Sequence, residues 1–337
     1  MIDLISLISD VVLNPKIVDQ YIPHAFYPSD ASVEWEEDGI RKVAGSCLRQ
    51  QYYRLLEVEE EPKPDNPQLS RELKCRAGNV MHDDITNLIK ISGVYLGHET
   101  KMARRNPVPV SGRVDLWVLD KSTGRPVGVE VKTVGGYYPS KMYISGPNAI
   151  PKLEHALQSM VYLHHYSEWG VKEWIIFYIE RADCSVKQHV LSIDENGSLV
   201  VRNDQIAEVW KHITADNIYA RWIKLTKHLE EAELPPRDYV RQYSNEQLIL
   251  MADKGELNKT DTERVKKKAQ VLPGNPEPYI AKGDWPCAWC DYSTRCYSKN
   301  PVPSETFNGF NPIAKTCFKR PKNVVSEPIR ARSQDIL

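Results

Sequence analysis

Glu130 and Lys132 carry opposite charges within a valine-rich segment, RPVGVEVKT (125–133). If this segment is a strand, its side chains alternate between two faces, and these two charged residues share one face. The other face then carries Val127, Val129 and Val131. A carboxylate and an ammonium group placed in this way can bind a divalent cation and stabilise negative charge on a phosphate. The alternative is a cross-strand salt bridge on a half-exposed strand.

Asp115 lies in a second alternating segment, GRVDLWVLD (112–120), which precedes the first. The connection between the two segments, DKSTGRP, is rich in residues that form turns. The pattern therefore predicts a β-hairpin. Such a hairpin would bring Asp115 to the same edge of a sheet as Glu130 and Lys132.

Two predicted helices flank this hairpin and carry further polar candidates. His82 lies in a helix expected over residues 71–93, although a lone histidine there is more often a core residue. Gln158 and Tyr162 are four residues apart, so they share one face of a helix expected over 153–166. That face is either solvated surface or a layer packed over the hairpin.

The order of these residues resembles the RecB-type branch of the PD-(D/E)XK nucleases. The matching positions are His82, Asp115, Glu130-Val131-Lys132 and Gln158-x₃-Tyr162. Val114 stands where the family's name has proline, at a position that bears no chemistry. The resemblance implies an α/β fold: a PD-(D/E)XK restriction-endonuclease-like core with a mixed central sheet flanked by helices. It covers about residues 46–236 and 285–297.

The same resemblance implies a site for Mg²⁺ or Mn²⁺. Its metal ligands would be His82, Asp115, Glu130 and the main-chain carbonyl of Val131. Its catalytic residues would be Asp115, Glu130, Lys132, Gln158 and Tyr162. Lys132 would orient the attacking water and stabilise negative charge. Gln158 and Tyr162 would position the nucleic acid or the metal shell. We also expect the loop tyrosines Tyr137, Tyr138 and Tyr143 to stack on unpaired bases.

Three cysteines near the end of the chain have metal-ligand spacing, Cys287-x₂-Cys290-x₅-Cys296. Three clustered thiolates and one distant thiolate favour an iron–sulfur cluster over zinc, although four cysteines alone are compatible with both. Cys47 resembles the leading cysteine of the iron–sulfur members of the nuclease family, which implies a 4Fe-4S cluster held by Cys47, Cys287, Cys290 and Cys296. Cys75 is the competing fourth ligand.

The chain of 337 residues suggests one elaborated domain or two. We expect an N-terminal helical extension (1–45), a nuclease core (46–236), an insertion (237–284), a cysteine cluster that closes the core (285–300) and a basic tail (301–337). Within the core, residues 174–180 and 186–193 predict a second pair of strands, and residues 202–232 predict a long helix.

Net charge is −1, so the chain as a whole does not attract polyanions, although local basic segments are present. No apolar run reaches the roughly 18 residues that span a bilayer. The N-terminus lacks the basic region of a signal peptide, so we expect a cytoplasmic protein without membrane contact, whose cysteines do not form structural disulfides. No phosphate-binding loop of an ATP motor is present in the sequence.

Together these features predict a metal-dependent DNA nuclease, most simply an exonuclease acting on single-stranded DNA ends. The resemblance includes CRISPR-adaptation exonucleases and the nuclease domains of recombination helicase–nucleases, which implies DNA and a helicase or CRISPR-adaptation protein as partners. The rival hypotheses are a catalytically quiet DNA-binding subunit of a larger repair or adaptation complex and a zinc-stapled scaffold.

Overall fold

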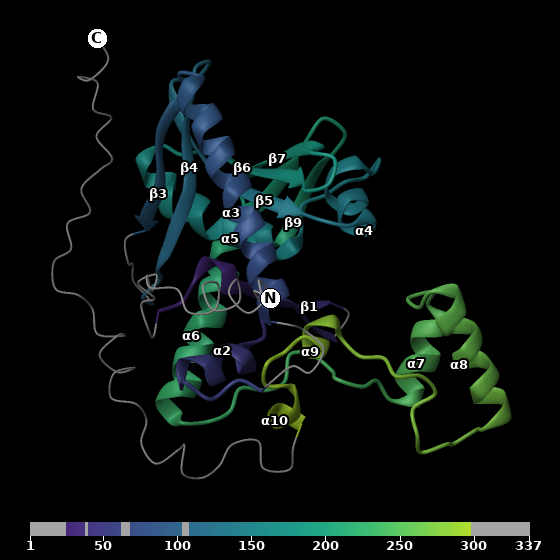
Figure 1. Ribbon diagram of the computed structural model, residues 1–337. Coiled ribbons are helices and arrows are strands. Elements are labelled where there is room, and N and C mark those ends of the chain that lie inside the picture. The colour runs from purple at the N-terminus through teal and green to yellow at the C-terminus, as the bar shows by residue number, and fades with distance from the viewer. Residues whose placement is uncertain (1–24, 38–39, 62–67, 103–107, 298–337) are drawn as a thin grey trace, which may run out of the picture. The chain divides into compact units, whose positions relative to one another are not determined.

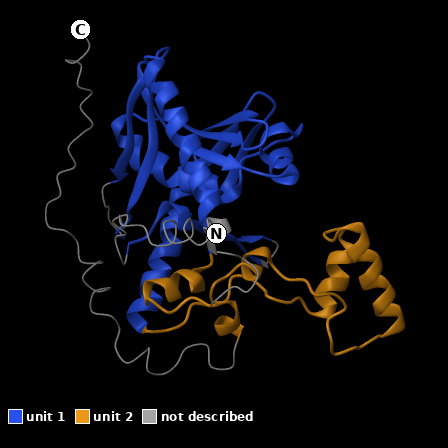
Figure 2. Cartoon of the chain, in the orientation of Figure 1, with its two compact units in different colours: residues 1–46, 64–231, 311–337 blue, residues 47–63, 232–310 orange. Residues whose placement is uncertain are grey.

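The computed structural model describes residues 25–37, 40–61, 68–102 and 108–297 (Figure 1). The chain divides into two compact units (Figure 2). Unit 1 comprises residues 1–46, 64–231 and 311–337, and unit 2 comprises residues 47–63 and 232–310. This division differs from the expected core of residues 46–236, because residues 47–63 join the C-terminal part of the chain. Residues 1–24 of the expected helical extension (1–45) and the basic tail (301–337) lie outside the described residues. The described part of that extension contains two strands, over 32–37 and 40–45, rather than a long helix.

Unit 1 is built on a mixed seven-stranded sheet with the order β3-β4-β5-β6-β7-β8-β9. The strands are β3 (Tyr95–Met102), β4 (Gly112–Asp120), β5 (Arg125–Val134), β6 (Trp174–Glu180), β7 (Val186–Ile193), β8 (Ser198–Arg202) and β9 (Ala207–Thr214). Only β5 and β6 are parallel neighbours in this sheet. A parallel pair needs a long crossover, which here contains α4 (Tyr137–Ser140), η2 (Lys141–Ser145), α5 (Leu153–Tyr166) and η3 (Ser167–Trp169).

Helices cover both faces of this sheet. The long helix α3 (Gln68–Ile91) packs through Met81, Ile85 and Ile89 on the face that carries Val129 and Val131. Helix α5 covers the opposite face, where the ring of its Tyr162 stacks on Trp174 of β6 with centroids 5.2 Å apart. The hairpin, both flanking helices and the pair β6–β7 therefore confirm the predicted α/β layers.

The region expected as one helix over 202–232 is different. Strand β9 occupies residues 207–214, and helix α6 begins only at Ala215 and ends at Glu231. The prediction was wrong because β9 is an edge strand with mostly exposed, polar side chains, which gives no clear alternation in the sequence. Strand β3 at the other edge was also missed, for the same physical reason.

A small hairpin precedes the core of unit 1. It consists of β1 (Ser32–Glu37) and β2 (Ile40–Gly45), after a short 3-10 turn, η1 (Pro28–Asp30). Glu34 receives an ion pair from the buried Arg221 of α6 at 2.6 Å and another from Arg41 at 2.8 Å. The bonds from Arg41 and then Arg221 lower the pKa of Glu34 to about 2, although burial opposes them. This carboxylate thus fixes the hairpin to α6.

Unit 2 contains α2 (Leu48–Leu55), α7 (Asn245–Asp253), α8 (Lys259–Val271), α9 (Trp285–Ala288) and α10 (Ser293–Tyr297). Helices α7 and α8 pack against each other around Leu248, Ala252, Leu257, Val265 and Tyr279. Side-chain caps at Ser244 and Asn258 begin these two helices. The segment expected as an insertion of weak periodicity therefore includes a helix pair with its own small core.

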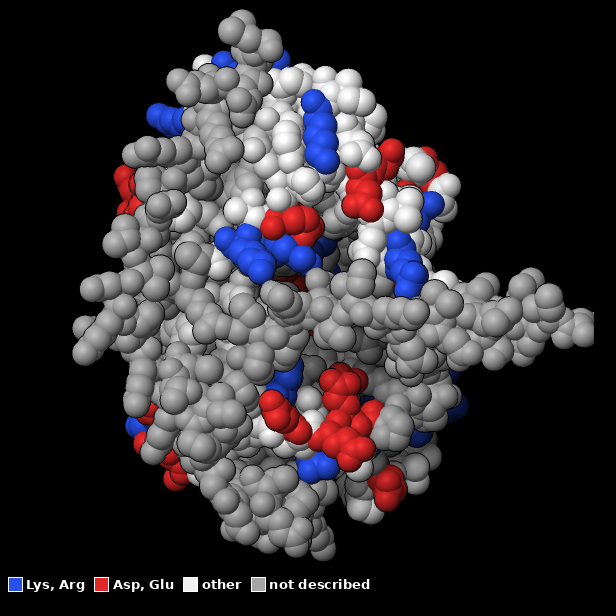
Figure 3. Space-filling model, turned by 60° about the vertical axis from the view of Figure 1, so that its left-hand side comes forward, with Lys and Arg blue, Asp and Glu red and all other residues white. Residues whose placement is uncertain are grey.

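Among the described residues, no helix is both long and apolar enough to cross a membrane. On the face shown in Figure 3, basic and acidic side chains of the described residues lie next to each other rather than in separate areas. The described residues visible on this face therefore form no broad basic surface.

Candidate active site and cysteine pocket

The β4–β5 hairpin brings Asp115, Glu130 and Lys132 together. Leu116 pairs with Val129 across the hairpin, and the next residues along the two strands are Asp115 and Glu130. The Asp115 carboxylate accepts a hydrogen bond of 2.9 Å from the main-chain N–H of Val131. The Lys132 ammonium contacts Glu130 Oε1 at 2.5 Å. The charged residues within the valine-rich strand thus form one cluster.

His82 approaches this cluster from helix α3. Its Nδ1 atom lies 3.8 Å from Asp115 Oδ2, and its side chain is 30% exposed. Burial and the nearby charge of Lys132 lower the pKa of His82, against the opposite effect of Glu130. The imidazole is therefore neutral near pH 7, which is the form that binds metal ions.

Burial has a strong effect on the two carboxyl groups. It raises the pKa of Asp115 and of Glu130, and the positive charge of Lys132 only partly opposes this. Burial works against the charge of Lys132 as well, but Glu130 and Asp115 outweigh it and raise the pKa of the ammonium group. Two desolvated carboxylates beside a single ammonium group leave the cluster short of positive charge.

The donor set of this cluster fits a hard divalent cation. Glu130 Oε2 is buried and has no hydrogen-bond partner among the described residues, which is costly unless a ligand satisfies it. Carboxylate oxygens with one imidazole are donors that suit Mg²⁺ and Mn²⁺. Within the described ranges, no three or more histidine, cysteine, aspartate or glutamate side chains already surround a common point as metal ligands.

Tyr162 supports the cluster from helix α5 instead of opening toward a substrate. Its side chain is only 2% exposed, and its hydroxyl donates to the carbonyl oxygen of Arg113 at 2.9 Å. A Cβ atom added to Gly112 would lie 2.9 Å from the same hydroxyl oxygen, so this close approach requires glycine. Burial raises the pKa of Tyr162, and Gln158 has the opposite effect. The predicted pair thus lies beside the cluster, and Tyr162 acts on it through β4.

Glu99 and Arg113 are site residues that the sequence analysis missed. Strand β3 pairs His98 with Leu116 and Thr100 with Val114, which puts Glu99 across from Asp115. Glu99 has φ +50° within a strand, a strained value for a residue with a side chain. Its carboxylate contacts Arg113 Nε at 2.5 Å. Only recognition of β3 as a strand next to β4 would have revealed this pair.

Of the three loop tyrosines expected to stack on bases, Tyr143 is placed differently from the other two. Its ring stacks on Tyr178 of β6, with centroids 5.6 Å apart and planes inclined by 18°. Tyr137 and Tyr138 remain 69% and 76% exposed. One face of the Tyr143 ring is therefore occupied by β6, whereas the other two rings are more exposed, and the expected stacking on bases stays a prediction.

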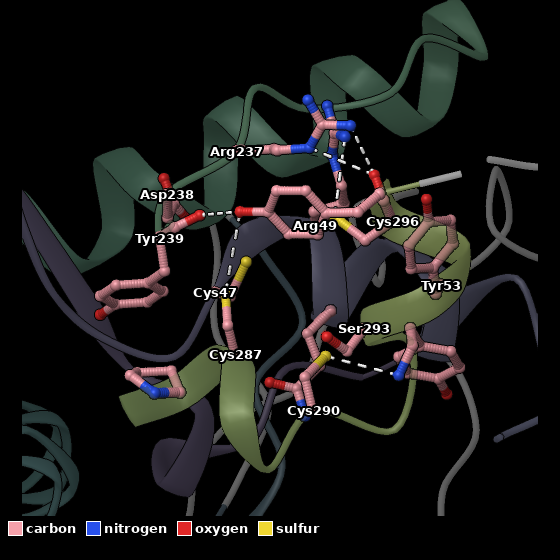
Figure 4. A pocket seen from close by; sticks show the side chains of 14 residues that line it. Cys47, Arg49, Tyr53, Arg237, Asp238, Tyr239, Cys287, Cys290, Ser293 and Cys296 are labelled. Atoms are coloured by element: carbon pink, nitrogen blue, oxygen red, sulfur yellow. Dashed lines mark hydrogen bonds between the residues drawn. The ribbon is translucent and has the colours of Figure 1, made fainter. Parts of the chain in front are cut away.

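In unit 2, Cys47, Cys287, Cys290 and Cys296 line one pocket (Figure 4). Cys47 precedes the first turn of α2, Cys287 belongs to α9, and Cys296 belongs to α10. All described cysteines are free thiols. Cys75, the competing ligand, is exposed on α3 of unit 1 and does not line this pocket. The pocket thus gathers the four cysteines that were proposed from the sequence.

N–H donors reach two of the sulfur atoms in this pocket. The N–H group of Tyr292 donates to Cys290 Sγ at 3.4 Å, and Arg49 Nη1 donates to Cys296 Sγ at 3.7 Å. Burial raises the pKa of Cys47 to about 12 and that of Cys290 to about 11. Both thiols are therefore neutral as they stand, and a bound metal would have to displace their protons. Donors aimed at sulfur suit metal-bound thiolates.

Comparisons with known proteins add little to this geometry. No family model matches the chain, and no curated protein matches it. A crystal structure of SSO0001 is similar to it over 89% of this chain and 98% of the other, with 13% sequence identity and a TM-score of 0.38. A TM-score of this size carries no argument about fold or function.

Proposed function

We propose that this protein is a metal-dependent nuclease that hydrolyses phosphodiester bonds in DNA. The observation that supports this best is the cluster of His82, Asp115, Glu130 and Lys132, in which Glu130 Oε2 is buried and has no partner among the residues that the structure describes. Two desolvated carboxylates, a neutral imidazole and an ammonium group are the groups that such a reaction uses. The resemblance to the RecB-type nucleases points to the same residues.

The residues have distinct roles in this proposal. Asp115 and Glu130 would hold a divalent cation, with His82 beside Asp115. When bound, the cation would supply Lewis-acid chemistry, lowering the pKa of water and offsetting charge on the phosphate. Lys132 would stabilise negative charge on the phosphate and orient the water, because its ammonium group lies at Glu130 and keeps a raised pKa. Tyr162 would hold β4 so that Asp115 keeps its position.

We further propose single-stranded DNA ends as the substrate, since Tyr137 and Tyr138 expose their rings in the segment that follows the strand bearing Glu130 and Lys132. The test is incubation of end-labelled single-stranded and double-stranded DNA with Mn²⁺, with products sized over time. Shortening of the single strand from its ends, stopped by a chelator and absent in Glu130→Gln, is expected. If the protein binds DNA but cleaves it under none of the metal conditions, the result would favour the rival hypothesis of a catalytically quiet DNA-binding subunit.

We propose a second cofactor, a 4Fe-4S cluster held by Cys47, Cys287, Cys290 and Cys296. The support is the single pocket that these cysteines line and the N–H donors directed at Cys290 and Cys296. Iron and acid-labile sulfide should be present in protein purified without oxygen. Stoichiometric zinc without iron would instead support the zinc-stapled alternative.

A further inference from the structure

The chain turns sharply just beyond the strand that bears Glu130 and Lys132. Gly136 has φ +97° and precedes α4, a conformation that favours glycine. A Cβ atom added to the neighbouring Gly135 would lie 2.5 Å from the guanidinium group of Arg181. The turn begins three residues after Lys132, and it directs α4 and η2 away from β5.

The inner side of this segment is firmly anchored in unit 1. Ile144 is 5% exposed, and the ring of Tyr143 stacks on Tyr178. The carbonyl oxygen of Tyr143 accepts a hydrogen bond of 3.0 Å from Nε2 of the buried His189. The Tyr178 hydroxyl also lies 2.8 Å from His155 Nδ1. The segment is thus attached to the sheet through its inner side chains and backbone.

The outer side of the segment exposes aromatic rings and a cation. Tyr137 and Tyr138 are 69% and 76% exposed, and their rings meet edge to face with centroids 5.5 Å apart. The ammonium group of Lys141 lies 5.6 Å from the centroid of the Tyr137 ring. Exposed aromatic faces combined with a basic side chain are the pattern by which proteins bind unpaired bases.

A cavity of about 520 Å³ opens beside Tyr137, within the size range of small-ligand sites. Lys141, Glu180 and Asp183 are among the residues that line it. Two carboxylates against one ammonium group disfavour a phosphate in the cavity. Glu180 Oε2 already accepts the main-chain N–H groups of Ala182 and Asp183. Carboxylates favour the exocyclic amino groups of adenine, cytosine and guanine, whereas the N3–H group of thymine lies between two carbonyl oxygens that a carboxylate repels.

We propose that Tyr137 and this cavity form a subsite for one unpaired nucleobase of a single-stranded nucleic acid, and that Tyr138 stacks on the next base. The inference rests on the proposed nuclease function, because that function would bring a nucleic-acid strand to this edge of the sheet. A duplex cannot use the subsite, because its bases are stacked on both faces and paired at their edges. The subsite prefers amino-bearing bases over thymine.

The test measures binding to the full-length protein in a chelator, so that no cleavage occurs. Single-stranded oligonucleotides with one 2-aminopurine report stacking by fluorescence, and Kd is measured for mixed-sequence DNA, oligo(dT) and a blunt duplex. Tyr137→Ala and Tyr138→Ala should each weaken single-strand binding by at least about fivefold. The Phe variants should bind as the wild type does, because they keep the stacking face. Duplex binding should change little.

Ile223→Ala, at a side chain 47% exposed on α6, is the matched surface control and should leave all Kd values unchanged. Asp183→Leu should reduce the preference for amino-bearing bases over thymine. Unchanged Kd in both Ala variants, or equal losses for single strands and duplex, would overturn the subsite. So would deoxyadenosine monophosphate binding as tightly as the strand, because a free nucleotide would then be the ligand.

The two proposals fail separately. If single-strand binding depends on Tyr137 and Tyr138 but the protein cleaves no DNA with Mn²⁺, the proposed nuclease function is overturned and the proposed subsite stands. If the protein cleaves single strands and neither substitution changes its Kd for them, the proposed nuclease function stands and the proposed subsite is overturned. Circular dichroism of each variant checks that the fold is retained.

Discussion

The Tyr162 hydroxyl is hydrogen-bonded to both ends of the backbone of Arg113: it donates to the carbonyl oxygen at 2.9 Å and accepts from the N–H at 3.2 Å. Arg113 lies two residues before Asp115 on β4. Because the Tyr162 ring also stacks on Trp174 of β6, one side chain connects α5 to two strands of the sheet. The position of the Asp115 carboxylate thus depends on a helix that begins nearly forty residues later in the chain.

Tyr162→Phe should test this connection. The ring stacking remains, but the buried backbone groups of Arg113 lose their partner, so the free energy of unfolding should fall by about 1–2 kcal/mol. The cleavage rate should fall by roughly tenfold or more, because Asp115 loses its fixed position. Urea denaturation and single-turnover cleavage measure the two effects. Ile223→Ala, at an exposed side chain of α6, is the control, and an unchanged cleavage rate in Tyr162→Phe would contradict the positioning role.

Lys132→Ala should lower cleavage by about 10²- to 10³-fold, the usual loss when a group that stabilises transition-state charge is removed. The substitution also leaves Glu130 without its ion-pair partner at 2.5 Å. Single-turnover rates at saturating Mn²⁺ separate this loss from weaker metal binding. Lys227→Ala, in an exposed pair with Glu231 on α6, should cleave normally. Cleavage within a few-fold of the wild type in Lys132→Ala would remove this lysine from the mechanism.

Stability should depend on pH and on divalent cations together. Burial raises the pKa of Asp115 and Glu130, so the folded state binds more protons than the unfolded chain between roughly pH 4 and 7. The contribution of these groups to stability is present at low pH and is lost as pH rises through this range. The lowered pKa of His82 acts in the opposite direction below roughly pH 6.5.

A cation that binds the ionised carboxylates should reverse this loss. We therefore expect Mg²⁺ or Mn²⁺ to raise Tm more at pH 8 than at pH 5, measured by differential scanning calorimetry. Asp115→Asn should be more stable than the wild type without metal at pH 8, by about 1–2 kcal/mol, and should gain less from metal. Equal increases in Tm at both pH values, or an undiminished increase in Asp115→Asn, would contradict the proposed cation site.

Cys47→Ser should lose iron and destabilise the protein. Cys47 and Cys287 are 287 − 47 = 240 positions apart, so a shared cluster closes most of the chain into a loop. By the expression used for disulfides, such a loop stabilises by about 5 kcal/mol, which is comparable to the stability of a whole domain. Iron content and Tm measure both effects. Cys75→Ser, at an exposed cysteine of α3, should keep its iron, and loss of iron in that variant alone would transfer the fourth ligand to Cys75.

The sequence by itself determined the elements whose pattern is local. The alternation around Glu130 predicted β5 and the shared face of its charged residues, since period-2 patterning is a property of the strand alone. The apolar periodicity of residues 71–93 and 153–166 predicted α3 and α5. The metal-ligand spacing of Cys287, Cys290 and Cys296 could likewise be recognised within one short segment of chain.

Only the tertiary structure decided which remote residues meet. Glu99 lies across from Asp115 because its neighbours His98 and Thr100 pair with Leu116 and Val114, and its polar, exposed strand gives no signal for that pairing. Tyr143 stacks on Tyr178 because the crossover brings it against β6, a strand that begins about thirty residues later. Cys47 reaches the C-terminal cysteines because residues 47–63 belong to unit 2. Strand register and long-range packing depend on the burial of whole surfaces against each other, which short patterns in one sequence do not specify.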